Sequence, residues 1–320
     1  MAKHTVIVTD NRHGDYSIEE EILKDCGAQL IVENCATEYE LVRLCGRADG
    51  LLLDQAPMTA RVIRSLEKVR VISRYGVGYD NVDVEACTEK KIYLANVPDY
   101  CDEDVTDMAI AHIFCSLRQL VRRDAGIRRG EWNLGRENIF RIKGKTLSIV
   151  GYGRSGRRLH AKMSAMGLGE VLACDPYVDR ADMEKNGAKP VDFAEAVSRA
   201  DILSLHIPLT AETANIIDES VFTRMKETAI LINTSRGGVV DHGALVKALK
   251  SQRIAFAGLD THHIEPLPHD DPLLKLENCV LSDHAGFNTQ EGVTELKTKV
   301  AMNVRDVLNG GTPRYWLNRF

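Results

Sequence analysis

The sequence predicts an α/β protein of two domains, each built on a doubly wound parallel sheet with helices on both faces. Short β-branched runs alternate with helical patterns through the first part of the chain, and a second alternation begins near Thr146. Such alternation is typical of parallel sheets, because each crossover between parallel strands needs a long connection, usually a helix. A length of 320 residues is also long for a single hydrophobic core and suits two.

The first alternation predicts strands at residues 5–9, 29–32, 50–53, 69–72 and 92–95. Helical patterns separate them at 17–24, 38–44, 59–66 and 82–89. Ser17 can cap the first of these helices, with Glu20 as its reciprocal partner in a capping box. A long helix, about 102–120, follows an extended segment that contains Pro98, and we expect it to cross into the second domain.

The second alternation predicts strands at residues 146–150, 171–174, 202–206, 229–233, 256–259 and 279–281. Asp241 opens a helical stretch that continues over 243–250. The last helix, about 291–308, repeats apolar residues at helical spacing and therefore needs a sheet face to cover. We assign it to the first domain, which is then discontinuous: residues 1–100 and 287–320 enclose a second domain of residues 101–286.

A glycine-rich turn lies between the strand at 146–150 and a short helix, and its sequence is Gly151-Tyr152-Gly153-Arg154-Ser155-Gly156. Gly151 permits a tight turn, Gly153 lets the backbone approach a pyrophosphate, and Gly156 lets the helix pack close to the strand. The helix N-terminus attracts the phosphates. Asp175 ends the next strand, where its carboxylate can accept from ribose hydroxyls and would repel a 2′-phosphate. The stretch therefore predicts NAD as cofactor, in preference to NADP.

Polar residues suited to hydride transfer follow the later strands. Arg236 can clamp a carboxylate through two hydrogen bonds and polarise a carbonyl. His284 can give a proton to an alkoxide or remove it, and Glu265 can orient and stabilise the charged imidazole. Arg, Glu and His recur at loop ends in many proteins, so spacing alone does not distinguish this set from surface residues.

A second glycine turn follows the strand predicted at 69–72, and its sequence is Arg74-Tyr75-Gly76-Val77-Gly78. In open α/β sheets, ligands bind at the carboxyl ends of the strands. The backbone N–H groups of Val77 and Gly78 can therefore hold a carboxylate. The alternative is a simple turn between a strand and a helix.

Composition argues against several other functions. The net charge of -5 gives no reason to expect nucleic acid or an anionic membrane as a partner. No apolar run approaches the ~20 residues that cross a bilayer. The eight cysteines are scattered and form no CxxC pair, so we expect reduced thiols and a cytoplasmic location.

Two clusters leave alternatives open. Residues 118–145 are rich in arginine, including Arg136, and contain Trp132; acids such as Glu137 break up the positive charge, so a solvated or subunit-contacting arm is favoured over a nucleic-acid patch. A second cluster could suggest a metal site: His262, His263, His269, Asp270 and Asp271. Hydride transfer needs no metal and prolines mark an irregular segment there, so we expect a solvated surface loop and no metal.

Ordered motifs along essentially the whole chain resemble the D-isomer-specific 2-hydroxyacid dehydrogenases. The motifs are Arg74-Tyr75-Gly76-Val77-Gly78-Tyr79-Asp80-Asn81, Asn96-Val97-Pro98, the 151–175 unit, His206-Ile207-Pro208-Leu209-Thr210, Asn233-Thr234-Ser235-Arg236-Gly237-Gly238, Gly258-Leu259-Asp260 with Glu265-Pro266, and Asp283-His284-Ala285-Gly286. The loops look closest to the branch that contains C-terminal-binding proteins and hydroxypyruvate reductases. The resemblance implies a flavodoxin-like substrate domain, a Rossmann NAD domain, a cleft between them and a homodimer formed through the NAD domain.

The resemblance also implies roles by position. Arg236 would clamp the substrate, Glu265 would pair with the catalytic histidine, and His284 would donate the proton. The other substrate contacts would be Gly76, Val77, Gly78 and Tyr100. The cofactor contacts would be Gly151, Gly153, Arg154, Ser155, Gly156, Asp175, His206, Pro208, Thr213, Thr234 and Asp260.

Some positions depart from the family pattern. The loop Asp54-Gln55-Ala56-Pro57 lacks the arginine that phosphoglycerate-type members use to hold a phosphate, and Arg74 is the only nearby cation by sequence. We therefore expect an unphosphorylated 2-keto acid and its D-2-hydroxy acid as substrates. The alternatives are a 3-phosphoglycerate dehydrogenase, an NAD-sensing transcriptional co-regulator, and a formate or phosphite dehydrogenase. Glu265 argues against the formate type, in which an amide stands at this position.

Overall fold

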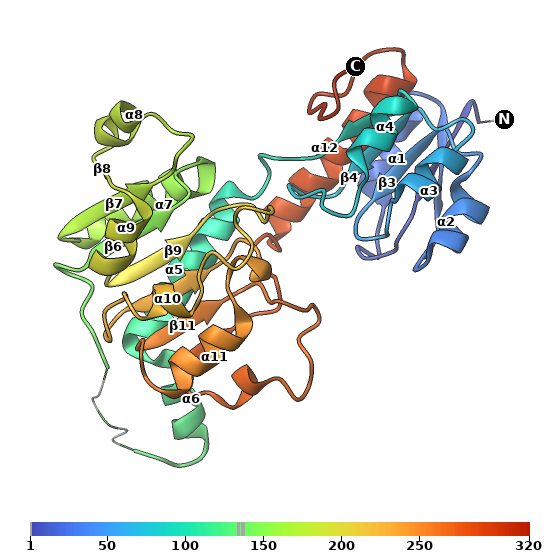
Figure 1. The fold of residues 1–320 in the computed structure, drawn as a ribbon. Coiled ribbons are helices and arrows are strands. Elements are labelled where there is room, and N and C mark those ends of the chain that lie inside the picture. The colour runs from blue at the N-terminus through green and yellow to red at the C-terminus, as the bar shows by residue number, and fades with distance from the viewer. Residues whose placement is uncertain (1, 133–134, 136–137) are drawn as a thin grey trace. The chain divides into compact units, whose positions relative to one another are not determined.

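Two parallel sheets organise the chain, and each belongs to a separate compact unit of the computed structural model (Figure 1). The first unit comprises Met1–Cys101 with Thr289–Phe320, and the second comprises Asp102–Asn288. The structure describes residues 2–132, 135 and 138–320. The predicted fold class, two doubly wound parallel α/β sheets, is confirmed. The cleft expected between the domains stays a prediction.

The first unit contains a five-stranded sheet in the order β2-β1-β3-β4-β5, which is the flavodoxin-like order. Neighbouring strands all pair in parallel. The strands are β1 (His4–Val8), β2 (Ala28–Val32), β3 (Gly50–Leu53), β4 (Val71–Arg74) and β5 (Tyr93–Ala95). The helices are α1 (Ser17–Lys24), α2 (Glu38–Cys45), α3 (Ala60–Ser65), α4 (Val84–Glu89) and, from the C-terminal segment, α12 (Gln290–Leu308).

Helices cover both faces of this first sheet. On one face, α2, α3 and α4 pack against strand residues such as Leu51 and Ile72. On the other face, α12 contacts β3 and β4, and a Cβ at Gly50 would lie only 2.9 Å from Val304 Cγ1. In Figure 1 the red α12 accordingly lies among the blue elements of the first unit. Burial on both faces explains why β3 is apolar and buried throughout.

The second unit contains a seven-stranded sheet in the order β12-β11-β10-β9-β6-β7-β8. The strands are β6 (Thr146–Val150), β7 (Glu170–Cys174), β8 (Lys189–Pro190), β9 (Ile202–Leu205), β10 (Ile230–Asn233), β11 (Phe256–Leu259) and β12 (Cys279–Leu281). The α-helices are α5 (Asp102–Arg118), α6 (Leu120–Arg128), α7 (Arg154–Met163), α8 (Arg180–Lys185), α9 (Phe193–Arg199), α10 (Glu219–Phe222) and α11 (His242–Lys250). The 3₁₀ helices are η1 (Ser164–Met166), η2 (Gly237–Val239) and η3 (Pro272–Lys275).

Two apolar layers enclose the second sheet. Residues of α5 and α7, such as Ile113 and Leu159, pack against one face. Residues of α9, α10 and α11, such as Val197, Phe222 and Leu245, pack against the other. The central strands β9, β10 and β11 are therefore buried throughout.

The strand order reverses beside β6, because β7 lies on one side of it and β9 on the other. Ligands of open α/β sheets bind at such a switch point, at the carboxyl ends of the strands. Gly151 directly follows β6 with a φ of +92°, and a Cβ there would clash with the carbonyl oxygen of His206, which follows β9. A Cβ at Gly156 would clash with the carbonyl oxygen of Gly151. Backbone contacts at the switch point therefore require both glycines.

The capping box predicted for Ser17 and Glu20 is wrong. Ser17 lies inside α1 and bonds to Asp15 instead. The capping box belongs to α2, where the N–H of Glu40 donates to Thr37 Oγ1 at 3.3 Å and the N–H of Thr37 donates to Glu40 Oε2 at 3.0 Å. Thr37 has the extended backbone that an N-cap needs, whereas Ser17 is already helical.

The helix predicted at 102–120 ends at Arg118, because Gln119 has a left-handed φ of +50°. The separate helix α6 then begins at Leu120, in the arginine-rich segment for which the sequence analysis named no helix. The short elements β8, α8, α9 and α10 were also not predicted. Elements this short offer only one turn or a few residues of pattern, too little for a periodicity to stand out.

The arginine-rich segment forms ion pairs within the chain. Arg122 Nε lies 3.0 Å from Glu277 Oε2, and Arg128 Nε lies 2.7 Å from Asp124 Oδ2. Arg136 and Glu137, which belonged to the same predicted arm, lie outside the described residues. Within the part of the chain that the structure describes, no helix is both long and apolar enough to cross a membrane.

Candidate active site

His284 and Glu265 form a hydrogen-bonded pair at the carboxyl edge of the second sheet. Glu265 lies in the loop after β11, and His284 follows the neighbouring strand β12. His284 Nδ1 lies 2.7 Å from Glu265 Oε2, and the N–H of His262 donates to Glu265 Oε1 at 2.9 Å. Burial raises the pKa of Glu265, but the hydrogen bonds from His284 and His262 outweigh it, so the pKa is lowered. The carboxylate is therefore charged at neutral pH and can stabilise a protonated imidazole.

Asp260 holds the segment that carries His284. Its carboxylate is buried and accepts hydrogen bonds from the hydroxyl of Ser282 at 2.6 Å and from the N–H groups of Ala285 and Gly286 at 3.0 and 2.9 Å. Its carbonyl oxygen accepts from the N–H of His284 at 2.8 Å. These bonds stabilise the left-handed backbone of His284, with φ of +55°, which is uncommon for a residue with a side chain. The side chain of Asp260 is thus committed to this segment.

Arg236 lies at the same edge, after β10, which is the next strand beyond β11. The side chain of Asn233 shapes the turn: its Nδ2 donates to the carbonyl of Arg236 at 2.9 Å, and its Oδ1 accepts from the N–H of Ser235 at 3.0 Å. The guanidinium of Arg236 donates to the carbonyl of Ser235 at 2.8 Å. Three neighbouring strands therefore end in the arginine, the carboxylate and the histidine that the sequence singled out.

Asp175 supports the glycine-rich turn directly. Its Oδ2 accepts from the N–H of Tyr152 at 2.8 Å, and its Oδ1 accepts from the N–H of Tyr177 at 2.9 Å. A Cβ at Gly153 would meet no described atom within 4 Å, so this glycine faces open space. Because Gly153 also occupies the N-cap of α7 and has no side chain, the first N–H groups of the helix can serve an anion. The turn fits a dinucleotide pyrophosphate.

The other residues expected at the cofactor lie along this edge as well. The Oγ1 of Thr234 is buried and has no partner among the described residues, the situation of a group that a ligand or water satisfies. His206 Nε2 lies 2.8 Å from Ser204 Oγ, and burial lowers the pKa of His206 to about 4. The carbonyl of Pro208 accepts from the hydroxyl of Thr213 at 2.6 Å, which shapes the loop after β9.

The side chains of Arg154 and Ser155 are engaged with Asp102 at the start of α5. Arg154 Nε lies 3.2 Å from Asp102 Oδ2, and the hydroxyl of Ser155 donates to Asp102 Oδ1 at 3.4 Å. The resemblance implied pyrophosphate contacts for both residues. Their backbone N–H groups belong to the first turn of α7, so the contribution that this geometry favours is from the backbone.

The substrate loop expected in the first unit follows β4. Gly76 has a φ of +115°, and a Cβ there would clash with the guanidinium of Arg74, so only glycine allows that side chain to lie over the turn. The Tyr100 hydroxyl lies 3.7 Å from the same Cβ position. No described residue accepts a hydrogen bond from the N–H groups of Val77 and Gly78. Two such neighbouring donors suit a carboxylate.

The sequence missed a group of basic side chains around Asp54, because it suggested only Arg74. Asp54 Oδ2 lies 3.6 Å from Arg12 Nε and 3.6 Å from His13 Nε2, and Asp54 Oδ1 lies 3.8 Å from Arg74 Nη2. Burial lowers the pKa of His13, with Lys297 as the next cause, so that ring is neutral at pH 7. Arg12 and His13 follow β1, the neighbour of β3, and only this strand order reveals their place.

The loop after β11 was expected to be a solvated surface loop, but part of it is buried. Asp271 is buried at 5% exposure and caps η3. Asp271 and His263 lie together with His242 of α11, which the sequence did not connect with them. His269 and Asp270 are exposed and lie outside this group.

Fold and site together define a class of protein. A glycine-rich turn at the switch point, an acid after the next strand and a histidine–carboxylate pair at the same sheet edge are the parts of a dinucleotide-dependent oxidoreductase that transfers hydride. Comparison with known proteins then gives the family.

Residues 110–286 match the family model for the "D-isomer specific 2-hydroxyacid dehydrogenase, NAD binding domain". The chain is 40% identical to a glyoxylate reductase of Korarchaeum cryptofilum over 285 residues, 88% of this chain and 85% of that protein. It is 37% identical to a D-3-phosphoglycerate dehydrogenase of Methanocaldococcus jannaschii over 307 residues, 95% of this chain but 57% of that protein. The crystal structure of a glyoxylate reductase from Paecilomyes thermophila superimposes with a TM-score of 0.89 at 28% identity, over 99% of both chains.

The chain belongs to the D-isomer specific 2-hydroxyacid dehydrogenase family. It is an NAD-dependent oxidoreductase that interconverts 2-keto acids and D-2-hydroxy acids, as the resemblance in its motifs implied. It spans most of the glyoxylate reductase that it matches but little more than half of the phosphoglycerate dehydrogenase.

The low pKa of His206 predicts a pH effect on stability. The folded protein keeps this ring neutral down to about pH 4, whereas the unfolded chain takes up a proton near the ordinary value of 6.5. Stability is therefore lost as the pH falls from 6.5 to 4, by up to about 1.4 kcal/mol per pH unit for this group. We expect His206→Gln to lose less stability than the wild type across this window, measured by urea unfolding at several pH values. Identical pH dependence in both proteins would contradict the prediction.

Proposed function

We propose that the protein reduces a small, unphosphorylated 2-keto acid of the glyoxylate or hydroxypyruvate type to the D-2-hydroxy acid, and that it catalyses the reverse oxidation. The observation that carries the proposal is the hydrogen bond of 2.7 Å between His284 Nδ1 and Glu265 Oε2, at the sheet edge that also carries Arg236. Glyoxylate reductases of Korarchaeum cryptofilum and Thermococcus litoralis, of which the chain covers 85% and 81%, support a small substrate.

The tautomer of His284 follows from its partner. A ring nitrogen that faces a carboxylate carries a proton, so Nδ1 is the donor to Glu265 and Nε2 is the atom that exchanges a proton with the substrate. In reduction, bound NADH would supply the hydride that the carbonyl carbon receives. His284 gives the Nε2 proton to the carbonyl oxygen, which becomes the hydroxyl, and Glu265 stabilises the imidazolium before this transfer.

The remaining roles follow the same geometry. Arg236 binds the substrate carboxylate and polarises the carbonyl, as a planar guanidinium can do through two parallel hydrogen bonds. The backbone of Gly76, Val77 and Gly78 is assigned to the substrate carboxylate, with Tyr100 as a further substrate contact. Asp260 is a positioning residue that acts through the segment bearing His284.

We assign the cofactor to the carboxyl edge of the second sheet. The N–H groups of the 151–156 turn, including those of Arg154 and Ser155, would hold the pyrophosphate. The carboxylate of Asp175 would accept from the ribose hydroxyls, because each of its oxygens accepts one backbone hydrogen bond and retains a second lone pair. The further contacts assigned to the cofactor are His206, Pro208, Thr213 and Thr234.

The charge near Asp54 bears on the choice of substrate. The guanidinium of Arg74 lies 3.8 Å from Asp54 and donates to the carbonyl of Tyr75, so part of its charge is already balanced inside the protein. An acid at this place would repel a phosphate dianion. This supports an unphosphorylated substrate.

A phosphorylated substrate of the 3-phosphoglycerate type is the second candidate. Arg12 and Arg74 both approach Asp54, so two cations accompany one carboxylate, and the D-3-phosphoglycerate dehydrogenase of Methanocaldococcus jannaschii is 37% identical over 95% of this chain. Arg12 is half exposed, and its charge is screened by water more strongly than that of Asp54. We therefore rank this candidate second.

We further propose a homodimer formed through the second unit, in the cytoplasm. Large apolar side chains are exposed on α6 and just beyond it: Leu120, Val121, Ile127 and Trp132. Exposed apolar residues gathered on one segment are typical of a protein interface. The eight cysteines are all unpaired, which suits a reducing compartment.

His284→Ala should lower kcat for glyoxylate reduction by ~10²–10⁴, which is the usual share of general acid–base catalysis. NADH binding, measured by fluorescence titration, should change little, because the substitution leaves the glycine-rich turn intact. Near-normal turnover in this variant would remove His284 from the mechanism.

Glu265→Gln provides the contrast for the same assay. It keeps an acceptor for His284 Nδ1 but removes the negative charge that favours the protonated ring. In the pH profile of kcat/KM for reduction, the fall in activity at high pH should therefore move to lower pH. A pH profile that stays in place would mean that Glu265 does not act through His284.

Asp175→Asn should narrow the preference for NAD over NADP, because it removes the charge that repels a 2′-phosphate and keeps an acceptor for the backbone. We expect the wild type to favour NAD in kcat/KM and the ratio to fall by about tenfold, or about 1.4 kcal/mol. The control is Asp182→Asn, which removes an exposed charge on α8 of the same unit. Equal kcat/KM values for the two cofactors in the wild type would contradict the assignment.

Asp54→Asn should shift the substrate preference toward a phosphorylated compound. The wild type should have the higher kcat/KM for hydroxypyruvate than for 3-phosphohydroxypyruvate at low ionic strength, where charge effects are largest. The substitution leaves Arg12 and Arg74 without this anionic partner, so we expect the ratio to move by about tenfold. Glu21→Gln, on the exposed face of α1, is the charge-matched control. A wild type that prefers the phosphorylated substrate would favour the second candidate.

A further inference from the structure

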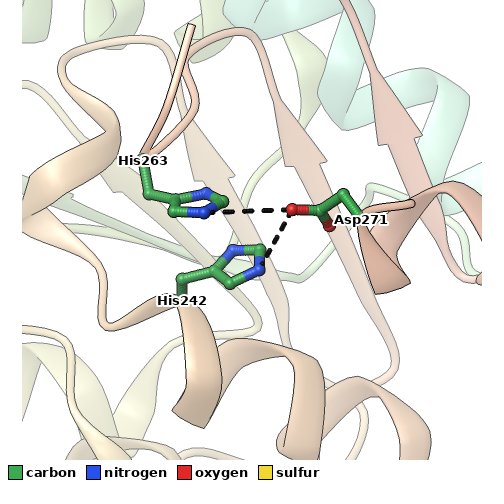
Figure 2. Close-up of side chains that lie close together, drawn as sticks. All are labelled: His242, His263 and Asp271. Atoms are coloured by element: carbon green, nitrogen blue, oxygen red, sulfur yellow. Dashed lines mark ion pairs between the residues drawn. The ribbon is translucent and has the colours of Figure 1, made fainter. Parts of the chain in front are cut away.

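Three side chains meet on the second unit, away from the hydrogen-bonded catalytic pair. Figure 2 shows His242, His263 and Asp271 with their polar atoms turned toward one another. His242 begins α11, His263 lies in the loop after β11, and Asp271 is the N-cap of η3. The candidate ligand atoms of all three lie within 4.8 Å of one another.

The distances between the polar atoms of this group suit shared metal ligands better than direct hydrogen bonds. His242 Nε2 lies 3.2 Å from Asp271 Oδ2, and His263 Nε2 lies 3.9 Å from the same oxygen, which is too long for a hydrogen bond. Two ligands of a tetrahedral zinc ion lie about 3.3 Å apart when each bond is about 2.0–2.1 Å. The three side chains therefore need only small adjustments to share one ion.

Asp271 is anchored in a way that suits a metal ligand. Its side chain is 3% exposed, and its Oδ1 accepts from the N–H of Leu273 at 2.9 Å, which leaves Oδ2 directed at the two histidines. A buried carboxylate is stable only with hydrogen bonds or a cation beside it. The hydrogen bond from the backbone to Oδ1 also orients the carboxylate, as hydrogen bonds from outer-shell groups orient the ligands of metal sites.

The two imidazoles are poorly suited to balancing this charge as a pair of cations. Their rings are stacked with centroids 3.6 Å apart and planes inclined by 22°. Two positively charged rings this close would repel each other, whereas two neutral imidazoles each offer the lone pair that a metal ion requires.

A small cavity adjoins the two histidines. It measures about 10 Å³ and is lined by both of them, by Thr261 and by apolar side chains such as Val240 and Leu273. Thr261 is 2% exposed, and its hydroxyl oxygen has no partner among the described residues. About one water molecule fits such a space, and the hydroxyl of Thr261 would be one of its polar partners. An open position filled by water completes a tetrahedral set of two histidines and one carboxylate.

We propose that His242, His263 and Asp271 bind a divalent transition-metal ion of the zinc type, with a water molecule as the fourth ligand. Two imidazoles suit zinc and its neighbours in the transition series, whereas magnesium and calcium take oxygen ligands almost exclusively. The Nε2 atoms of both rings already face Asp271 Oδ2, and the side chain of His263, which is 26% exposed, has room to adjust.

Such an ion would link the loop after β11 to helix α11. His263 stands two positions before Glu265, and His242 lies on the helix that follows the Arg236 turn. The backbones of these two segments already touch, because a Cβ at Gly237 would clash with the carbonyl group of His262. The bound ion would thus brace the loop that carries Glu265 without contacting the catalytic pair, and the binding claim does not depend on which 2-keto acid is the substrate.

The test is a titration of the full-length protein, prepared without a polyhistidine tag and treated with a chelator. Cobalt(II) should bind with one equivalent per chain and give visible d–d absorption without the near-ultraviolet charge-transfer bands of thiolate ligands. Zinc should displace it and raise the melting temperature. His242→Gln and Asp271→Asn should each lower the affinity by about 100-fold or more, since loss of outer partners alone costs about 10–100-fold.

His269→Gln is the matched control, because it removes an exposed histidine from the same loop but outside the group. It should bind as the wild type does. Circular dichroism and turnover with NADH show whether His242→Gln is folded, since His242 is not assigned to catalysis. The proposal is overturned if the wild type binds no cobalt or zinc, or if the two ligand variants bind both ions as tightly as His269→Gln does.

Discussion

The buried carboxylate of Asp260 is the constraint on which the position of the segment around His284 depends. It accepts hydrogen bonds from the segment 282–286 and so ties the end of β11 to the segment after β12. His112 of α5 reaches the same Ser282 hydroxyl with its Nε2 at 2.8 Å, and burial lowers the pKa of His112, so the ring there is neutral. A buried charge is tolerated only with donors around it. Here those donors also hold the segment that carries His284.

Strand order explains why residues far apart in the sequence share one edge. Arg236, Glu265 and His284 follow β10, β11 and β12, which are consecutive in the sheet, and parallel strands all present their carboxyl ends on the same side. The switch point beside β6 brings the glycine-rich turn onto this edge as well. The carbonyl of His206, which follows β9, lies close to Gly151 there. The glycine-rich turn after β6 is therefore shaped in part by a strand that comes much later in the chain.

Local motifs could be predicted from the sequence, and contacts across the fold could not. The glycine-rich turn and Asp175 form one βαβ unit, whose geometry follows from residue type and spacing. The pairing of His284 with Glu265 was implied by the resemblance to the family, and the structure gives a distance of 2.7 Å between His284 Nδ1 and Glu265 Oε2. The basic side chains near Asp54 depend on the adjacency of β1 and β3, which periodicity does not encode. The capping box predicted for Ser17 and Glu20 was wrong for a related reason, because a helix cap depends on backbone conformation as well as on residue type.

Two histidine–carboxylate groups take their carboxylates from the loop after β11, and the distances within them suit different chemistries. His284 and Glu265 approach to 2.7 Å, so a proton lies between them and the ring is held as a donor and acceptor of protons. Asp271 faces two histidines at 3.2 and 3.9 Å, and it is buried while Glu265 is half exposed. A single proton cannot satisfy two stacked rings and one carboxylate at these distances, whereas one divalent ion can. The residue types would suit either role, and the spacing and burial favour the proposed proton transfer for the first group and the proposed metal binding for the second.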